Sequence, residues 1–408
     1  MSGSTCGARY ETISISVTPE KKRSLVRDWL DAALESVDPR RLVREALAGS
    51  RAPSRFIAIG KAAVPMSWGA VDALGPLPGV CIAGNPAETP SGVELIVGNH
   101  PIPGDQSFEA GRRALEWVSK SDGPILALIS GGGSSLCEAA LPGIEESYLL
   151  EANKLLLYSG APISEVNLIR QHLSAIKCGG LARAAGGQVE TLVLSDVCGG
   201  ASHLVASGPT IHGELDPETA LQLMKKYGLP STEQVRSAIH HPSSGVIRNG
   251  PVQVLADGRT AGTAVVDAAR NSGVDSRLED GWLIGGLERR LDSFLGNASE
   301  GATVAVGEPT LEVIGNGEGG RNTHAAALAA RSIAGTNTVF AAFATDGVDG
   351  CSNSAGGLVD GQTTSRGGDA DQAIRSFDTA KYLDRANDLI HTGPTGTNVS
   401  DLWVSWKD

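Results

Sequence analysis

Five charged residues stand where apolar, strand-like runs of the sequence give way to polar ones. They are Lys61, Asp196, Arg321, Asp346 and Asp349. Phosphoryl transfer requires cations around the moving group, and carboxylates that hold a metal or remove a proton. We therefore predict that Lys61 and Arg321 clamp a phosphate and that the three aspartates serve as metal ligands or as the base. The simpler alternatives are a solvated cap residue for Lys61 and an Asx cap for Asp196.

Residues 125–136, ILALISGGGSSL, are the segment around which we expect the first half to be organised. An apolar strand ends there in three glycines, which can adopt positive φ and aim several backbone N–H groups at one anion. A helix that begins at Ser134 would add its free N–H groups. We assign substrate binding at this turn to Ser130, Gly131, Gly132, Ser134 and Ser135. A plain glycine-rich turn is the alternative.

A second group of polar side chains precedes Gly179-Gly180. It consists of Asn167, Arg170, His172, Ser174 and Lys177. On one face of a helix these groups could hold an acidic acceptor, although a solvated helix face also explains them. We assign Asn167, Arg170, His172 and Lys177 to acceptor binding.

The run Gly315-x-Gly317-x-x-Gly320 fits the dinucleotide-binding fingerprint, and Asp346 lies near the expected position after the next strand. A nicotinamide-dependent reductase is therefore a competing hypothesis. Arg321 at the helix start suits a transferable phosphoryl group better. The pair Asp346 and Asp349 suits a hydrated Mg²⁺ better than a ribose hydroxyl.

Composition restricts the class of protein. A chain of 408 residues suits two domains with a cleft between them. With 52 glycines and only 4% aromatic residues, it is typical of α/β proteins. The formal charge of −12 argues against nucleic acid or an anionic membrane as a partner.

The six cysteines are scattered without metal-ligand spacing, and we interpret them as reduced thiols. No apolar run reaches the length of a membrane span, and the N-terminus lacks a signal-peptide pattern. We therefore expect a cytoplasmic protein, with residues 1–16 as a loose leader.

The first half alternates strands and helices. Two helices are expected within 19–48, and strands at 55–59, 80–83, 94–97, 125–130 and 190–194, with helices at 62–74, 107–120, 144–159 and 216–237. This order predicts right-handed βαβ units, a parallel sheet and ligands at the carboxyl ends of its strands. A polar loop at 240–250 marks the expected domain boundary.

The second half repeats the α/β rhythm. We expect strands at 252–256, 303–306, 310–314, 339–344 and 401–406, and helices at 263–272, 282–294 and 322–333.

Nine runs together resemble the glycerate 2-kinase family of the MOFRL type, which was once widely labelled hydroxypyruvate reductase. The runs are AIGKAA (58–63), NHPIPGDQS (99–107), LISGGGSSL (128–136), SGAPISEVNLIRQHLSAIK (159–177), LSDV (194–197), ASGPT (206–210), GEGGRN (317–322), TDGVDG (345–350) and TGPTGTNVSDL (392–402). The resemblance extends in order over residues 24–404.

The resemblance implies a Rossmann-like N-terminal domain at 17–250, a smaller α/β MOFRL domain at 251–408 and an inter-domain cleft. It also implies ATP- and Mg²⁺-dependent phosphorylation of the 2-hydroxyl of D-glycerate, with Lys61, Asp196 and Arg321 at the positions of the proposed catalytic groups. We assign nucleotide binding to Gly208, Thr210, Gly317, Gly319, Gly320, Asn322, Gly393, Thr395, Thr397 and Asn398. The expected partners are a nucleotide and a small hydroxylated acceptor, and a homodimer is left open.

The chain departs from the family pattern at several positions. Gly200 and Ala201 stand where the family usually has two aspartates, and His324 stands where it has an acid. Cys178 and Asn353 differ as well. One hypothesis is an active kinase with a larger or less acidic acceptor, and the other is a noncatalytic descendant. For a kinase, Lys61 and Arg321 in different domains predict a hinged cleft that closes over both substrates.

Overall fold

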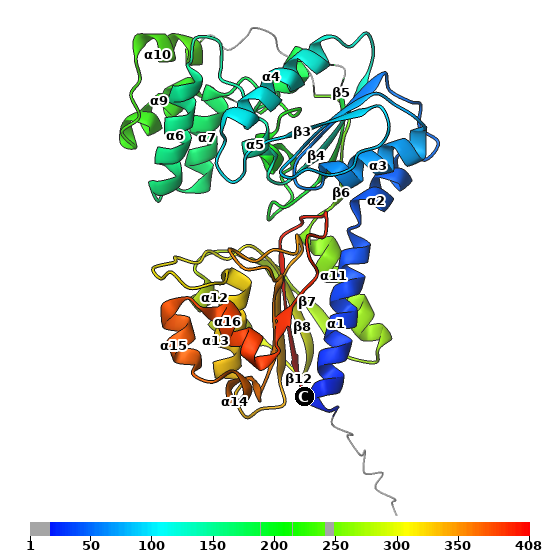
Figure 1. Ribbon diagram of the computed structural model, residues 1–408, viewed down its shortest axis with the longest axis vertical. Coiled ribbons are helices and arrows are strands. Elements are labelled where there is room, and N and C mark those ends of the chain that lie inside the picture. The colour runs from blue at the N-terminus through cyan, green and yellow to red at the C-terminus, as the bar shows by residue number, and fades with distance from the viewer. Residues whose placement is uncertain (1–16, 188, 214, 241–248) are drawn as a thin grey trace, which may run out of the picture.

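The computed structural model describes residues 17–187, 189–213, 215–240 and 249–408. They form two lobes, each built on its own six-stranded sheet (Figure 1). The expected leader at 1–16 and residues 241–248 of the expected loop lie outside the described residues.

The first sheet is parallel throughout, in the order β3-β2-β1-β4-β5-β6. Its strands are β1 (Arg55–Ile59), β2 (Gly79–Ala83), β3 (Val93–Val97), β4 (Ile125–Ser130), β5 (Val189–Leu194) and β6 (Val252–Ala256). The strand order reverses between the neighbours β1 and β4, and ligands of such sheets bind at that point, beyond the carboxyl ends. The predicted Rossmann-like parallel sheet is confirmed.

Helices cover both faces of this sheet. On β1, Phe56 and Ala58 enter one core while Ile57 and Ile59 enter another, as expected for a strand buried on both sides. The helical elements of this lobe are α2 (Pro39–Ala46), α3 (Ala63–Leu74), α4 (Asp105–Ser119), α5 (Gly133–Leu136), α6 (Glu146–Tyr158), α7 (Ile163–Leu173), α8 (Gly180–Ala184), η1 (Ser202–Ser207), α9 (Pro217–Lys226) and α10 (Glu233–His240). Helices α6, α7, α9 and α10 share a core of their own at one side of the lobe (Figure 1).

The second sheet is mixed, in the order β11-β10-β9-β12-β8-β7. Its strands are β7 (Ser276–Leu283), β8 (Gly301–Gly307), β9 (Val339–Ala344), β10 (Gly356–Asp360), β11 (Leu389–Ile390) and β12 (Asp401–Lys407). Strands β7 and β8 are parallel, and the other neighbours are antiparallel. The C-terminal strand β12 lies in the middle, so it ties the chain end into the core.

Helices also cover both faces of the second sheet. One face carries α1 (Pro19–Ser36) and α11 (Gly258–Asn271), and the other carries α12 (Leu287–Asn297), α13 (Arg321–Ser332), α15 (Ala370–Ser376) and α16 (Thr379–Ala386), with the short α14 (Thr363–Gly367) beside them. Phe343 and Trp406 pack on the face that α1 and α11 cover, and Phe340 and Trp403 pack on the face that α12 and α13 cover.

Helix α1 comes from the N-terminal end of the described chain but packs on the second sheet. The Trp29 ring lies 5.1 Å from the Trp406 ring, and the Lys22 ammonium lies 2.5 Å from an Asp408 carboxylate oxygen. The following helix α2 packs on α3 of the first lobe. The chain therefore crosses from one lobe to the other between α1 and α2.

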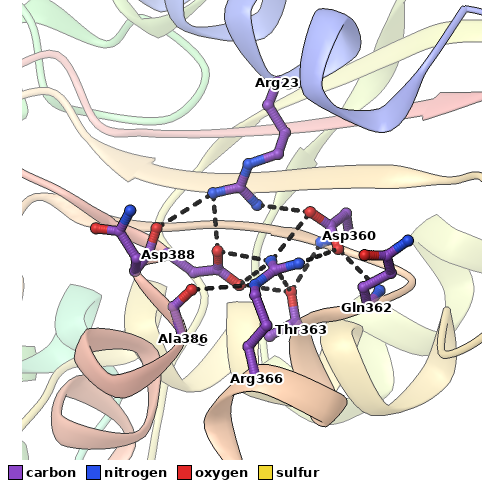
Figure 2. A network of polar contacts seen from close by, with 8 residues as sticks. Arg23, Asp360, Gln362, Thr363, Arg366, Ala386 and Asp388 are labelled. Carbon is purple, nitrogen blue, oxygen red and sulfur yellow. Dashed lines mark hydrogen bonds and ion pairs between the residues drawn. The ribbon is translucent and has the colours of Figure 1, made fainter.

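A polar network fixes α1 to the second lobe (Figure 2). The Arg23 guanidinium lies 3.0 Å from Asp360 and 2.8 Å from Asp388. Arg366 of α14 contacts the same two carboxylates, at 3.0 and 2.9 Å, and Thr363 donates to Asp388 at 2.5 Å. Two guanidinium groups thus balance two buried carboxylates.

The sheets divide the chain differently from the expected ranges 17–250 and 251–408. Strand β6 lies beyond residue 250 yet pairs with β5, and α1 lies before it yet packs on the second sheet. Both segments pack against elements that are distant in sequence, and local sequence patterns do not predict such contacts.

Three predicted elements are wrong. The expected strand at 310–314 is irregular, and Thr310 makes only an isolated bridge with Gly286. The expected helix at 282–294 is instead the end of β7 followed by α12, because Trp282 pairs with Val306. The expected helix at 216–237 is broken between α9 and α10.

None of the described helices has the length and apolarity to span a membrane.

Candidate active site

The turns after β1 and β4 lock together at the point where the strand order of the first sheet reverses. A Cβ at Gly60, where φ is +127°, would lie 2.2 Å from the Ser130 hydroxyl, so glycine is required. The buried Ser130 hydroxyl accepts from the Ala62 N–H at 3.0 Å, and the Lys61 N–H donates to the Gly131 carbonyl at 2.9 Å. Lys61 and Gly131 are thereby held side by side, as the sequence predicted for one sheet edge.

The Lys61 side chain reaches across to the second lobe. Its ammonium lies 2.7 Å from the Asp346 carboxylate, which follows β9. Asp346 also accepts from the Val348 N–H at 3.1 Å. The two side chains remain 34% and 19% exposed, so the pair is accessible to a ligand.

Asp196 lies against the glycine turn. A Cβ at Gly131 would lie 2.0 Å from its carboxylate, so this glycine makes room for Asp196. Asn398 donates to the same carboxylate at 3.5 Å, and Ser400 donates to the Asp196 carbonyl at 3.0 Å. Burial raises the pKa of Asp196; the charge of Lys61 lowers that pKa and the charge of Asp346 raises it.

Arg321 begins α13 and pairs with two carboxylates of the second lobe. Its guanidinium donates to both oxygens of Asp401, at 2.5 and 3.1 Å, and lies 3.2 Å from Glu308. Burial lowers the pKa of Arg321, but Asp401 and then Glu308 outweigh burial and the net shift is upward. The guanidinium is therefore a permanent positive charge with a fixed orientation.

Glu308 and Asp401 are site residues that the sequence analysis did not select. Burial, together with the charges of Asp401 and Asp196, raises the pKa of Glu308 to about 7 against the charge of Arg321. The charge of Lys61, from the first lobe, also lowers the pKa of Glu308. Their positions in the sequence could have indicated them, because Glu308 directly follows the buried strand β8 and Asp401 begins β12.

The expected metal ligand Asp349 has a different role. Its carboxylate accepts from the backbone N–H groups of Asn322 at 2.8 Å and Thr323 at 2.7 Å. Both oxygens therefore cap the N-terminus of α13, and Asp349 is 2% exposed. The structure thus gives Asp349 a helix-capping role that the sequence did not predict, and its expected metal role stays a prediction.

The glycine-rich run before α13 is packed against other backbone. A Cβ at Gly317 would lie 2.3 Å from the Asp378 nitrogen, and one at Gly320 would lie 2.5 Å from Asp349. A Cβ at Gly319 would meet the Thr379 hydroxyl at 2.6 Å. No strand of the described residues leads into this run, so the strand, turn and helix that define a dinucleotide fingerprint are not assembled here.

The other residues expected to bind nucleotide divide into two groups. The segment at 392–400 links the lobes: Thr397 donates to the Val37 carbonyl at 3.0 Å, and Asn398 reaches Asp196. Gly393 and Thr395 of that segment lie beside the 345–347 turn. Thr210, in contrast, is buried and accepts from Thr191 of β5 at 3.0 Å, and Gly208 packs against His203. Asn322 is also buried, at 1% exposure.

The expected acceptor-binding cluster does not share one surface. Lys177 is fully buried and pairs with Glu138, which also accepts from Ser174 at 2.5 Å. His172 is 2% exposed, and its Nδ1 bonds the Leu168 carbonyl. Arg170, in contrast, contacts the glycine turn, because its guanidinium donates to the Ser134 carbonyl at 3.2 Å. Lys177 and His172 thus lie in the interior, where they support the fold, and Asn167 lies on α7.

Two departures from the family pattern have structural consequences. His324 is buried and stacks on Phe377 with ring centroids 5.0 Å apart, and burial lowers its pKa to about 4. Gly200 faces open space, since no atom lies within 4 Å of a Cβ placed there.

Within the described ranges, no three His, Cys, Asp or Glu side chains are grouped so that they could hold a metal ion. A protein-only cage is therefore not built there. Mg²⁺ in phosphoryl-transfer enzymes is usually held by one or two carboxylates and by the phosphates of the substrate. Asp196 and Asp346, whose charges act on each other, fit that smaller set of ligands.

The site thus joins groups beyond the carboxyl ends of β1, β4 and β5 with groups that follow β8 and β9 or begin β12. Comparisons with known proteins show the family of the chain. Residues 25–240 match the family described as a domain of unknown function, DUF4147, and residues 301–401 match the MOFRL family. The first match alone spans more than half of the chain. The chain belongs to the DUF4147/MOFRL glycerate 2-kinase family.

Relatives in this family carry two kinds of name. The chain is 33% identical to a D-glycerate 2-kinase of Thermotoga maritima, over 95% of this chain and 98% of that protein. It is 32% identical to a putative hydroxypyruvate reductase of Agrobacterium vitis, over 93% of each. The crystal structure of the Thermotoga maritima glycerate kinase has a TM-score of 0.87 at 31% identity, over 96% of this chain and 100% of that one. A second crystal structure, of a Pyrococcus horikoshii protein, has a TM-score of 0.77 at 28% identity, over 96% and 99%.

Proposed function

We propose that the protein is an ATP-dependent kinase that transfers the γ-phosphoryl group to a hydroxyl of D-glycerate or of a related hydroxy acid. The observation that carries this proposal is the approach of Lys61 and Arg321 from opposite lobes to one group of carboxylates. Lys61 contacts Asp346, and its charge acts on Glu308, which Arg321 contacts. Cations on two sides of one space suit a phosphoryl group in transfer.

The residues of the chain divide the work of the transfer. Lys61 and the backbone N–H groups of the glycine turn hold the terminal phosphate, which competes with Asp346 for the ammonium. Arg321, held by Asp401, stabilises the charge that develops on the equatorial oxygens. The acceptor oxygen forms the new bond to phosphorus as the bond to the β-phosphate oxygen breaks, and ADP leaves.

Glu308 is the group best suited to take the proton of the acceptor hydroxyl. A base works best when its pKa lies near the operating pH, and the pKa of Glu308 is raised to about 7. Asp196, which the sequence favoured among the catalytic groups, is then free to serve with Asp346 as a ligand for Mg²⁺. Bound there, Mg²⁺ would neutralise phosphate charge.

The test is a screen of hydroxy acids with ATP and Mg²⁺, read by mass for the gain of one phosphoryl group. We expect at least one acceptor to be phosphorylated by the wild type and not by Lys61→Ala. Binding of ATP without transfer to any acceptor would contradict the proposal.

Two alternatives have less support. The first is a noncatalytic role, which Gly200 and Ala201 favour because the family usually has two aspartates there. Phosphorylation of any acceptor in the same screen would exclude it. The reductase hypothesis has less support because no strand precedes the glycine run in the described residues.

We also propose a cytoplasmic location, supported by five free cysteines among the described residues. A homodimer stays a prediction.

A further inference from the structure

A cavity of about 180 Å³ lies in the first lobe between α6, α7 and the segment at 101–103. Its wall is mainly apolar and includes Pro101, Ile102, Leu156, Leu157 and Val166, with Arg170 as its charged member. We call this cavity the α6–α7 pocket. An apolar cavity of about 150 Å³ in another protein holds benzene, so this volume suffices for a small branched or aromatic group.

Arg170 has unused hydrogen-bonding capacity in this pocket. Its Nε is buried and has no partner among the described residues, and its one hydrogen bond there is from Nη2 to the Ser134 carbonyl. The nearby carboxylate of Glu138 is already engaged by Lys177 and Ser174. A buried guanidinium with an unpaired donor is costly, and a carboxylate bound in the pocket that Arg170 lines would supply a charged acceptor to the guanidinium.

The pocket adjoins the proposed phosphate site. Ser134, which accepts from Arg170, directly follows Gly131, Gly132 and Gly133. On the other side, Pro101 of the pocket follows His100, whose ring lies 3.4 Å from the position of a Cβ on Gly132. A molecule in the pocket is therefore next to the glycine turn that holds Lys61.

We propose that the α6–α7 pocket binds the acceptor, and that the preferred acceptor is a 2-hydroxy acid with an apolar side chain. Its carboxylate binds Arg170, its side chain packs on Ile102, Leu156, Leu157 and Val166, and its hydroxyl faces the glycine turn. Asn153 also lines the pocket, but the wall is mainly apolar, so the hydroxymethyl group of glycerate would bury less apolar surface there than a branched side chain. The proposal rests on the proposed kinase function and narrows its substrate.

Calorimetry on the full chain without nucleotide compares D-glycerate with D-2-hydroxy-4-methylpentanoate. We expect the apolar acid to bind more tightly, by about four-fold for each buried methylene. Phosphoryl transfer to both acids is then measured by mass, and we expect kcat/KM to follow the same order.

Two pairs of variants locate the binding. Arg170→Gln is expected to weaken binding of both acids about 10- to 100-fold. Arg113→Gln on α4 should leave it unchanged, because Arg113 is exposed and pairs with Glu94 of β3. Leu157→Ser is expected to weaken binding of the apolar acid alone, about three- to ten-fold. Tyr158→Ser is its control, because Tyr158 is 81% exposed and does not line the pocket. Leu157 is itself 55% exposed, so this variant is expected to fold.

The outcomes separate the two proposals. Tight binding of the apolar acid, lost in Arg170→Gln and weakened in Leu157→Ser, without transfer to any acceptor, supports the pocket and contradicts the kinase. Transfer to glycerate with no preference for the apolar acid overturns the pocket proposal and leaves the kinase intact. Equal effects of Leu157→Ser and Tyr158→Ser also overturn it.

Discussion

Two clusters of arginine and carboxylate side chains in this protein differ in their balance of charge. In the network around α1, Arg23 and Arg366 face Asp360 and Asp388, two cations for two carboxylates (Figure 2). At the candidate active site, two cations face four carboxylates. These are Lys61 and Arg321, with Asp196, Asp346, Glu308 and Asp401.

The pKa values reflect this difference. In the α1 network, burial raises the pKa of Asp360, but the hydrogen bonds and charges of Arg366 and Arg23 outweigh burial and the pKa is lowered. At the candidate active site, burial raises the pKa values of Asp196, Glu308 and Asp401, and the two cations do not compensate. The first cluster is complete, whereas the second has excess negative charge that a proton or a cation would relieve.

The largest expected effect is at the candidate active site. Arg321→Ala should lower kcat/KM about 10³-fold or more, because it removes the charge that faces the moving phosphoryl group. Steady-state transfer kinetics measure this. Arg331→Ala is the control, since Arg331 lies on the same helix in an exposed pair with Asp371 and should leave kcat/KM unchanged. Similar losses in both variants would mean that α13, rather than the guanidinium of Arg321, is responsible.

The α1 network should respond in stability instead. Asp388→Ala leaves Arg23 and Arg366 with one carboxylate in place of two, and Asp388 is fully buried. We expect the free energy of unfolding to fall by about 3 kcal/mol, measured by denaturant titration, with kcat of the folded protein unchanged. A fall in kcat without loss of stability would place this network in the function.

The two clusters should also differ in their response to pH. Glu308 has a folded pKa of about 7, above its ordinary value of 4.5. Its contribution to stability is therefore present below pH 4.5 and lost as pH rises through 7. Asp360 has a lowered folded pKa, so its contribution is present above the ordinary pKa and lost as pH falls through the folded value.

Glu308→Gln tests this contrast. The variant should lose the pH-dependent part of stability near pH 7, with a moderate effect because the Glu308 side chain is 38% exposed. As a base, Glu308 should also give the wild type a kcat that falls below pH 7, about ten-fold per unit. A wild-type kcat that is flat from pH 5.5 to 8 would exclude Glu308 as the base.

The smallest effect concerns Asp349, the cap of α13. Asp349→Ala removes the cap of α13 and should cost about 1 to 2 kcal/mol of stability. The Mg²⁺ concentration for half-maximal activity should stay the same in Asp349→Ala and rise in Asp346→Ala. A rise in both would mean that Asp349 binds the metal, as the sequence predicted.

Local patterns predicted those parts of the fold that are locally encoded. The strands at 55–59 and 339–344 are buried apolar runs, and the structure gives them the expected bounds. Lys61, Asp196 and Arg321 were selected because each follows a run that ends at a sheet edge or a helix start, and their catalytic roles stay predictions. Strand β10 was missed because its sequence, GGLVD, is short and glycine-rich.

Contacts between distant segments were not predictable in this way. The sequence does not show that Lys177 pairs with Glu138, 39 residues away, or that α1 belongs to the second sheet. Glu308 was missed for the same reason, since its environment depends on Arg321, Asp401 and Asp196 from three other segments.

A double-mutant cycle between Lys61 and Arg321 tests the central claim most directly. If both cations act on one phosphoryl group across the cleft, Lys61→Ala and Arg321→Ala should each abolish most of the transfer from ATP to a hydroxy acid. The double variant should then be little worse than either single one. Losses that multiply independently, or full transfer in either single variant, would contradict the account.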